Sequence, residues 1–339
     1  MPDLVQDKRT RSIPCPRGID RRAFIASLIA TLSIGMARNA VADDAFPVTI
    51  DHAFGRTTIE REPERIVTLG WGGEDAVVAL GKVPVAMTYY PYWQSGIAEW
   101  NEPRIGASKP VPLGGMIDFE MVALLKPDLI LAVFSGVDEL AYRRLSRIAP
   151  VVTFEKGPWL ADWRAQMRLA GRALGRAELA AQLIARTEDV FRQLRRSYPI
   201  LQGRSVAFMT NFPLQAGVDV YLKGDRRLSA LEELGLLVPP AIRSLGKAGG
   251  GRYSVSLGME TLPDIDADVV VAWFQQGLDI ALIQQPILKM LPAIREKRVV
   301  TLDTPGEIWS VLVPTAISID RQFPHLAQRM AEVLENARK

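Results

Sequence analysis

The chain has 339 residues, enough for two domains of ordinary size. Hydrophobic residues make up 48% and charged residues 23%, a composition typical of a globular protein with a sizeable core. The formal net charge of +3 comes from residues 1–42, which hold seven basic and three acidic residues and leave 34 basic and 35 acidic residues in the remainder. A nucleic-acid-binding protein keeps its positive charge in the folded part, so the composition argues against that class.

Residues 1–42 have the pattern of a cleaved export signal. Arg21 and Arg22 precede a short apolar stretch that ends in the small residues Ala40-Val41-Ala42. The arginine pair is similar to a twin-arginine signal, although Asp20 stands where Ser or Thr is usual. The stretch is shorter than the roughly 20 apolar residues that span a bilayer, so we expect cleavage before Asp43 and a periplasmic mature protein.

Cysteine and histidine usage restricts the metal chemistry of the mature chain. The only cysteine, Cys15, lies within the predicted signal, so no disulfide and no thiolate metal site is expected in the mature protein. The only histidines are His52 and His325, far apart in the sequence. A zinc or manganese carrier needs a cluster of protein ligands, so any iron that is carried must arrive with its own chelating groups.

From residue 48 to residue 154 a small hairpin is followed by apolar strands that alternate with helical stretches. The hairpin is predicted at 48–50 and 57–59. The strands are predicted at residues 65–69, 83–87, 129–133 and 151–154. The helices are predicted at residues 74–80, 119–125 and 139–148, the second with Asp118 as its N-cap. This alternation predicts a parallel sheet covered by helices.

Residues 159–198 carry no strand signal. Apolar residues recur at steps of three and four, which predicts one long helix that joins two lobes and ends at Pro199. The strand and helix pattern then resumes. Strands are predicted at residues 205–209, 218–222, 269–273 and 299–302. Helices are predicted at residues 228–234 and 287–291, with a terminal helix at 315–337 that is interrupted near Pro324.

The expected fold is therefore α/β, with two lobes of mainly parallel sheet joined by one long rigid helix and a ligand cleft between them. The predicted organisation is an export signal at residues 1–42, an N-terminal lobe at 43–157, a connecting helical segment at 158–199 and a C-terminal lobe at 200–339.

Several segments resemble one known family, the solute-binding proteins of iron-siderophore and cobalamin ABC importers. Residues 65–71 (RIVTLGW), 117–130 (IDFEMVALLKPDLI) and 145–150 (LSRIAP) are similar to its N-terminal lobe. Residues 255–262 (VSLGMETL) and 266–270 (DADVV) are similar to its C-terminal lobe, with Gly258 and Met259 inserted. The resemblance covers residues 46–337. It implies a nearly pre-formed cleft for an iron(III)-siderophore, no catalytic activity and no resident cofactor or directly bound metal.

Aromatic residues are the main candidates for the ligand contact, because flat rings suit siderophore bodies and phenolic groups can hydrogen-bond iron-coordinating oxygens. Four aromatics crowd one loop that contains a proline, and core packing is expected to claim one or two of them. The candidates of the N-terminal lobe are Trp71, Tyr89, Tyr90, Tyr92 and Trp93. Those of the C-terminal lobe are Tyr253, Trp273 and Trp309. Trp309 matches the position of a ligand-contacting Trp in the ferric-hydroxamate binders of the family.

Cations are expected at the cleft because many ferric siderophores are anionic. The candidates are Lys109, Arg243, Lys247 and Arg252, with Lys109 and Arg252 ranked first. Lys109 only approximates the family's cleft arginine, and Phe134-Ser135-Gly136 stands where hydroxamate binders have a cleft tyrosine.

The resemblance also implies a docking role for Glu120 and Glu260, one from each lobe. Each would lie on a helix at a lobe tip and contact the inner-membrane permease dimer, which works with its ATPase. The protein is expected to be monomeric.

Two other functions fit parts of the pattern. The same fold could bind haem or cobalamin, with Tyr89, Tyr90 or Tyr92 as an axial ligand of haem. A periplasmic enzyme on this scaffold is the third possibility, and the lack of any nucleophile, phosphate-loop or HExxH motif argues against it.

Overall fold

The computed structural model describes residues 46–211, 217–248, 253–258, 260–274 and 288–337. The predicted export signal, its cleavage point and Arg252 lie outside these residues. None of the described helices is long and apolar enough to cross a membrane.

The first sheet has five parallel strands in the order β5-β4-β3-β6-β7. They are β3 (Ile66–Gly70), β4 (Ala86–Thr88), β5 (Val111–Leu113), β6 (Leu129–Phe134) and β7 (Val151–Thr153). The helices between them are α2 (Gly73–Ala79), α3 (Glu102–Ile105), α4 (Phe119–Leu124) and α5 (Glu139–Leu145). Every residue of β6 is buried, as expected of a central strand covered on both faces. The edge strand β5 was not predicted because Pro112 stands at its centre, and a proline argues against a strand in a sequence pattern.

An antiparallel hairpin precedes this sheet, formed by β1 (Val48–His52) and β2 (Gly55–Ile59). The hairpin and the strand and helix alternation therefore follow the prediction.

The second sheet has the order β10-β9-β8-β11-β12 and is of mixed direction. Its strands are β8 (Val206–Asn211), β9 (Val218–Tyr221), β10 (Ser254–Leu257), β11 (Val269–Phe274) and β12 (Val299–Thr301). β8, β11 and β12 run parallel, whereas β9 and β10 form an antiparallel edge. The accompanying helices are α8 (Arg226–Glu232), α9 (Pro240–Ala248), α11 (Pro292–Arg295) and α12 (Pro305–Leu312), with short 3₁₀ turns η2 (Leu262–Asp264) and η3 (Leu288–Met290). The predicted α/β class is confirmed, and β10 is an addition.

The segment predicted as one long helix consists of two. α6 (Trp163–Ala173) ends near Gly175, which has a φ of 61°, and α7 (Ala177–Ser197) begins two residues later and leads into η1 (Pro199–Leu201). Gly171 allows the helices to pack closely, because a Cβ there would stand 2.4 Å from the Cβ of Ala180. The turn at Gly175 interrupts the apolar periodicity only briefly, which is why the sequence reads as continuous.

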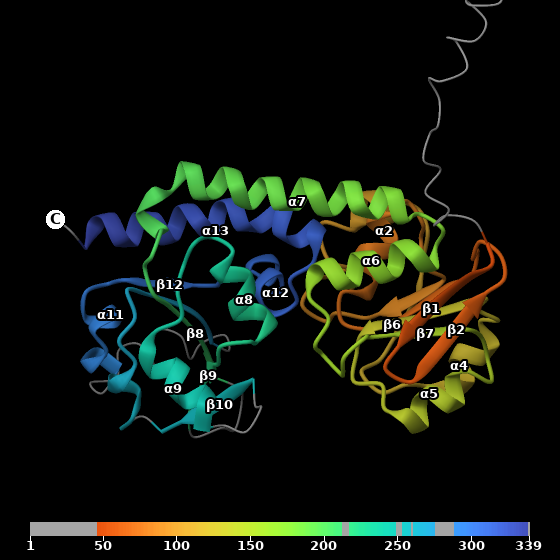
Figure 1. The fold of residues 1–339 in the computed structure, drawn as a ribbon, viewed down its shortest axis with the longest axis horizontal. Coiled ribbons are helices and arrows are strands. Elements are labelled where there is room, and N and C mark those ends of the chain that lie inside the picture. The colour runs from red at the N-terminus through yellow and green to blue at the C-terminus, as the bar shows by residue number, and fades with distance from the viewer. Residues whose placement is uncertain (1–45, 212–216, 249–252, 259, 275–287, 338–339) are drawn as a thin grey trace, which may run out of the picture. The chain divides into compact units, whose positions relative to one another are not determined.

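The terminal helix α13 (Ala316–Asn336) runs through Pro324 without a break, so the predicted interruption there is wrong. Packing of its buried apolar side chains compensates for the lost backbone hydrogen bond. Figure 1 shows α7 above both sheets with α13 beside it. We call the β3–β7 sheet with its helices the N-terminal lobe and the β8–β12 sheet with its helices the C-terminal lobe. Their outer limits stay a prediction, because α13 contacts elements of both and α6 bonds to Glu233 after α8.

Hydrogen bonds join the C-terminal lobe to α6 and to the turn before it. Arg164 donates from Nη1 and Nη2 to both carboxylate oxygens of Glu233 at 2.7 and 2.8 Å, and Trp163 Nε1 donates to the same carboxylate at 3.0 Å. Arg226 Nε donates to the carbonyl of Leu160 at 2.6 Å. Since Glu233 and Arg226 belong to the α8 region, these bonds hold the lobes at a defined separation.

Candidate functional site

A pocket of about 150 Å³ lies at the carboxyl edge of the N-terminal sheet. The last residues of β3 and β4 (Gly70 and Thr88), Leu113 of β5 and Ser135 after β6 contribute to its floor, because parallel strands end at one edge. Trp71, Trp159 and Met116 form walls. Clefts at this edge are where open α/β sheets bind ligands.

Gly70 makes this edge possible. Its φ is 86°, and a Cβ there would lie 2.2 Å from the carbonyl oxygen of Phe134. The next residue, Trp71, donates its backbone N–H to that carbonyl at 3.0 Å. The predicted candidate Trp71 is therefore held at the pocket by the backbone, with 37% of its surface exposed.

Trp159 is a pocket residue that the sequence reasoning missed. It lies in a turn before α6, with a φ of 61° that is uncommon for a bulky residue. Its ring centroid is 5.1 Å from that of Trp71 and 5.3 Å from that of Phe134, and its backbone N–H bonds to the carbonyl of Ser135 at 3.2 Å. An aromatic after Gly157-Pro158, just beyond a strand, is the signal that could have identified it.

Trp309 of α12 does not line the pocket but packs against its wall residue Trp71, so it brings the C-terminal lobe next to the pocket. Its ring centroid lies 5.5 Å from Trp71, 5.1 Å from Tyr90 and 5.6 Å from Tyr92. It is 8% exposed, and its Nε1 is buried with no hydrogen-bond partner among the described residues. An indole N–H that has lost water without gaining an acceptor carries a desolvation cost in this conformation.

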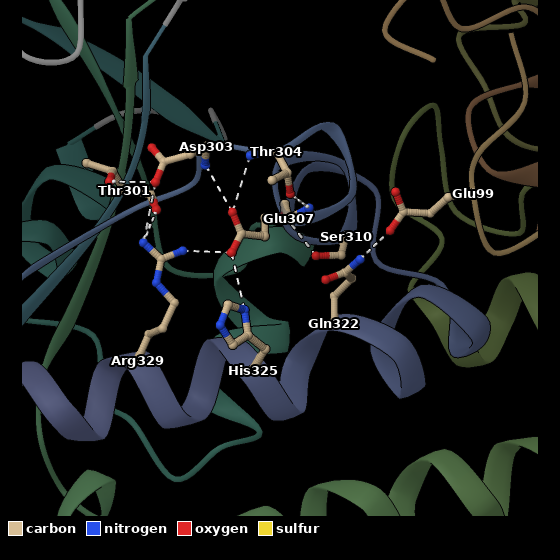
Figure 2. Close-up of polar contacts among 9 residues, drawn as sticks. All are labelled: Glu99, Thr301, Asp303, Thr304, Glu307, Ser310, Gln322, His325 and Arg329. Carbon is tan, nitrogen blue, oxygen red and sulfur yellow. Dashed lines mark hydrogen bonds and ion pairs between the residues drawn. The ribbon is translucent and has the colours of Figure 1, made fainter. Parts of the chain in front are cut away.

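The position of α12 is fixed by a polar cluster around Glu307 (Figure 2). Its carboxylate accepts from Arg329 Nη1 at 2.7 Å and from the backbone N–H groups of Asp303 and Thr304 at 3.1 and 3.3 Å, and it lies 3.3 Å from His325 Nδ1. Burial alone would raise the pKa of Glu307, but these donors outweigh it and hold the pKa below its usual range. Thr304 and Glu307 complete a capping box, so the helix that carries Trp309 is firmly anchored to α13.

The aromatic loop after β4 divides into exposed and buried residues. Tyr89 and Tyr92 are exposed, whereas Tyr90 and Trp93 are buried. Tyr90 accepts the backbone N–H of Gly72 at 2.9 Å and Trp93 stacks edge-on against Tyr90. Tyr90 and Trp93, both predicted as ligand contacts, are buried and pack edge-on against Trp309. Tyr89 and Tyr92 remain candidates.

The other predicted contacts are not brought into this pocket. Tyr253 is exposed before β10, and Trp273 is half-buried near the end of β11. Lys109 is exposed between α3 and β5 and does not line the pocket. Arg243 donates to the carbonyl of Val238 at 2.8 Å, and the side chains of Lys247 and Arg252 lie outside the described residues.

The two predicted docking residues have different settings. Glu120 is exposed in the first turn of α4, whose N-cap Asp118 accepts from the backbone N–H of Met121 at 2.9 Å as predicted. Glu260 is exposed but lies in a turn before η2, not on an α-helix as expected, because Pro263 and a short segment leave room only for a 3₁₀ turn.

Neither histidine lies at the pocket. His52 is buried in the β1–β2 hairpin against Thr57, and His325 belongs to the Glu307 cluster. No group of three His, Cys, Asp or Glu side chains in the described part of the chain could hold a metal ion. What the pocket offers a ligand is aromatic surface and hydrogen-bonding groups.

Comparison with known proteins agrees with this geometry. The family described as "Periplasmic binding protein" matches residues 66–305. The chain belongs to this family. This periplasmic binding protein is 29% identical over 295 residues to the Fe(3+) dicitrate-binding periplasmic protein FecB of Escherichia coli, covering 83% of this chain and 89% of FecB. It is 26% identical over 317 residues to the achromobactin-binding periplasmic protein of Dickeya dadantii, covering 86% and 90% of the two chains.

Solved structures give the same relationship for this periplasmic binding protein. PiaA of Streptococcus pneumoniae in complex with ferrichrome superposes with a TM-score of 0.74 at 27% identity, covering 85% of this chain and 99% of PiaA. Another structure of PiaA, described as an iron uptake ABC transporter substrate-binding protein, has a TM-score of 0.71 at 28% identity and covers 85% of this chain and all of PiaA.

Proposed function

We propose that this protein binds a ferric siderophore in the periplasm and delivers it to an inner-membrane ABC permease with its ATPase. It would act as a carrier and not as an enzyme, and residues 1–42 would be a cleaved twin-arginine export signal. The observation that carries the proposal is the aromatic site at the carboxyl edge of the N-terminal sheet, to which Trp309 adds a ring from the other lobe. The relatives named for ferric dicitrate and ferrichrome support the ligand class.

The chemistry of the site suits an iron chelate that brings its own ligands. Trp71 and Trp159 offer flat apolar surface in the pocket, and Trp309 packs against Trp71. A small movement of Trp309 on ligand binding would let its unpaired Nε1 donate to a chelate oxygen. Exposed Tyr92 beside Trp309 adds a phenolic group that can reach a chelate oxygen. The bonds between α6 and α8 would keep lobe movement small, as in a nearly pre-formed cleft.

Native mass spectrometry with a panel of ferric complexes tests the proposal. The panel contains ferric citrate, ferrichrome, a ferric tris-catecholate, haem and cobalamin, each with its iron-free or metal-free form as control. We expect a one-to-one complex with one ferric siderophore, together with quenching of tryptophan emission. Selective binding of haem, seen as a Soret band, or of cobalamin would identify that compound as the ligand in place of a ferric siderophore. Binding of none of the five would contradict the proposal.

A further inference from the structure

Two adjacent carboxyl side chains, Glu74 and Asp75, are buried at the start of α2, with 1% and 2% of their surfaces exposed. Acidic residues are rarely buried without a compensating cation or a role. No salt bridge is found for either within the described residues, so their cost must be offset by other contacts.

Asp75 links the two parts of the site. Its Oδ2 accepts from Trp100 Nε1 at 2.9 Å and from Thr315 Oγ1 at 2.6 Å, and its Oδ1 accepts from Asn101 Nδ2 at 2.5 Å. Thr315 is the N-cap of α13, the helix that anchors the Glu307 cluster. Asp75 therefore joins α2 of the N-terminal lobe to the helix behind Trp309.

Glu74 reaches the aromatic site by a different route. Glu74 lies close enough to Tyr90 to interact with it electrostatically, and the Tyr90 ring stands edge-on to Trp309 with a centroid distance of 5.1 Å. Its Oε2 is buried with no hydrogen-bond partner in the described part of the chain. A neutral carboxyl tolerates this better than a carboxylate, because desolvation penalises the charged form most.

The surroundings set which of the two carries a proton. Burial, and then the charge of Asp75, raises the pKa of Glu74 to about 8. Burial raises the pKa of Asp75 to about 6, against the opposing effect of its donors Thr315, Asn101 and Trp100 and of Arg104. The ionisable groups nearest the pair are Arg104 from α3 and Tyr90 from the loop after β4, whereas α13 presents the uncharged Thr315 and Ser318.

We propose that Glu74 and Asp75 form a proton-binding pair that positions the aromatic site and so couples ligand affinity to pH. Near neutrality Asp75 is the carboxylate that accepts three donors and Glu74 is the protonated partner beneath Tyr90. When Glu74 releases its proton to water, two buried carboxylates stand side by side, and Oε2 of Glu74 has no donor among the described residues. The repulsion loosens α2 from Thr315 and Tyr90 from Trp309, so ligand affinity falls as the pH rises above neutral. Only the affinity part of this inference rests on the proposed function.

The test compares the wild type with Glu74→Gln, which keeps the shape of the side chain but cannot ionise. Glu139→Gln, which removes an exposed carboxyl from α5, is the matched control. In ligand-free protein, tryptophan emission and the melting temperature are followed from pH 6 to pH 9. We expect the wild type and the control to show a red shift centred near pH 8, and a melting temperature that falls from pH 6 to about pH 8 and then levels off, because the raised pKa of Glu74 is the source of both changes. Glu74→Gln should show neither. An equal pH dependence in all three proteins would overturn the inference.

Ligand affinity is then measured with ferric citrate, or with the ferric complex that the panel identifies, in the same buffers. The wild-type Kd is expected to rise about three- to tenfold between pH 7 and pH 9, and that of Glu74→Gln to stay constant. Because Glu74→Gln lacks the titrating carboxyl, any change in its Kd with pH measures the effect of pH on the ferric complex, and this change is subtracted from that of the wild type. If no ferric complex binds at any pH, the proposed function fails. The ligand-free measurements would still show whether Glu74 and Asp75 act as a proton-binding pair.

Infrared spectroscopy of the wild type provides a test that needs no variant, should Glu74→Gln fold poorly. A buried protonated carboxyl band is expected at pH 7 and should disappear by pH 9. A spectrum without such a band at pH 7 would contradict the inference.

Discussion

The indole ring of Trp309 lies 5.5 Å from that of Trp71, so one aromatic side chain of the C-terminal lobe packs directly on the edge of the N-terminal sheet. Replacing Trp309 with Ala should weaken ferric-siderophore binding by about 1–3 kcal/mol, the usual loss for a buried aromatic contact. Trp309→Phe, which retains a ring, should lose less. Fluorescence titration measures both affinities, with circular dichroism to confirm folding. Wild-type affinity in Trp309→Ala would place the ligand elsewhere.

Trp159 combines a pocket ring with a left-handed backbone conformation, and the two effects can be separated by mutation. Trp159→Gly and Trp159→Ala both remove the ring from Trp71 and should weaken ligand binding equally. Glycine accepts the φ of 61° without strain, so the Gly variant should be more stable than the Ala variant by about 1 kcal/mol. Urea unfolding measures this difference. Equal stability of the two variants would show that the backbone relaxes there.

Sequence periodicity was sufficient for the fold because most strands here are buried runs and most helices have one apolar face. β6 and α7 show this, with all of Leu129–Phe134 buried and Phe191 and Leu194 on the inner face of the helix. It failed where local sequence is weakest. β5 is an edge strand with Pro112 at its centre, and the turn at Gly175 leaves the periodicity nearly intact.

The candidate site was only partly predictable, since composition identifies aromatic residues but not the direction in which each one points. Tyr90 and Tyr92 are two residues apart in one loop, yet Tyr90 is buried against Gly72 and Tyr92 is exposed. Trp159 was overlooked because a helix was expected to begin there. The buried pair Glu74 and Asp75 reads as an ordinary helix start, and only its three-dimensional contacts with Thr315 and Tyr90 reveal it.

The ion pair between Arg164 and Glu233 should contribute measurably to stability because it is bidentate and partly buried. Arg164→Met should lower the free energy of unfolding by about 1–2 kcal/mol. The Glu233 carboxylate would keep only its bond to Trp163 Nε1, and Glu188 would lose its ion pair with Arg164 as well. The matched control is Arg143→Met, which breaks an exposed pair on α5 and should cost less than about 0.5 kcal/mol. Chemical unfolding of both variants tests this, and equal losses would show that the lobes are not fastened here.

The lowered pKa of Glu307 leads us to expect that the protein loses stability at acid pH. Its pKa is held below the ordinary 4.5, so its ionised form stabilises the fold fully above that value, and the contribution is lost as the pH falls through the lowered pKa. Glu307→Gln should therefore be less stable than the wild type by about 1–2 kcal/mol at pH 7, and the difference should shrink towards pH 3. Urea unfolding at pH 7, 5 and 3 measures it. A difference that stays constant with pH would assign the loss to packing and not to charge.

Delivery to the permease is tested by the two exposed carboxylates, Glu120 on α4 and Glu260 before η2. One acidic contact from each lobe would let a two-fold permease recognise both halves of the carrier. Opposite charges across a partly hydrated surface mainly set the rate and specificity of association. Reversing both charges, as Glu120→Arg with Glu260→Arg, should abolish iron uptake in cells while siderophore affinity and melting temperature stay near wild type.

Single reversals allow the two lobes to be compared, because Glu120 is held by a capped helix turn and Glu260 by a shorter turn. Each single variant should reduce uptake less than the double variant if both carboxylates contact the permease. Glu139→Arg, an exposed charge reversal on the neighbouring helix α5, is the matched control and should transport normally. Uptake that persists in the double variant, or siderophore binding that is lost together with uptake, would rule out docking as the role of these residues.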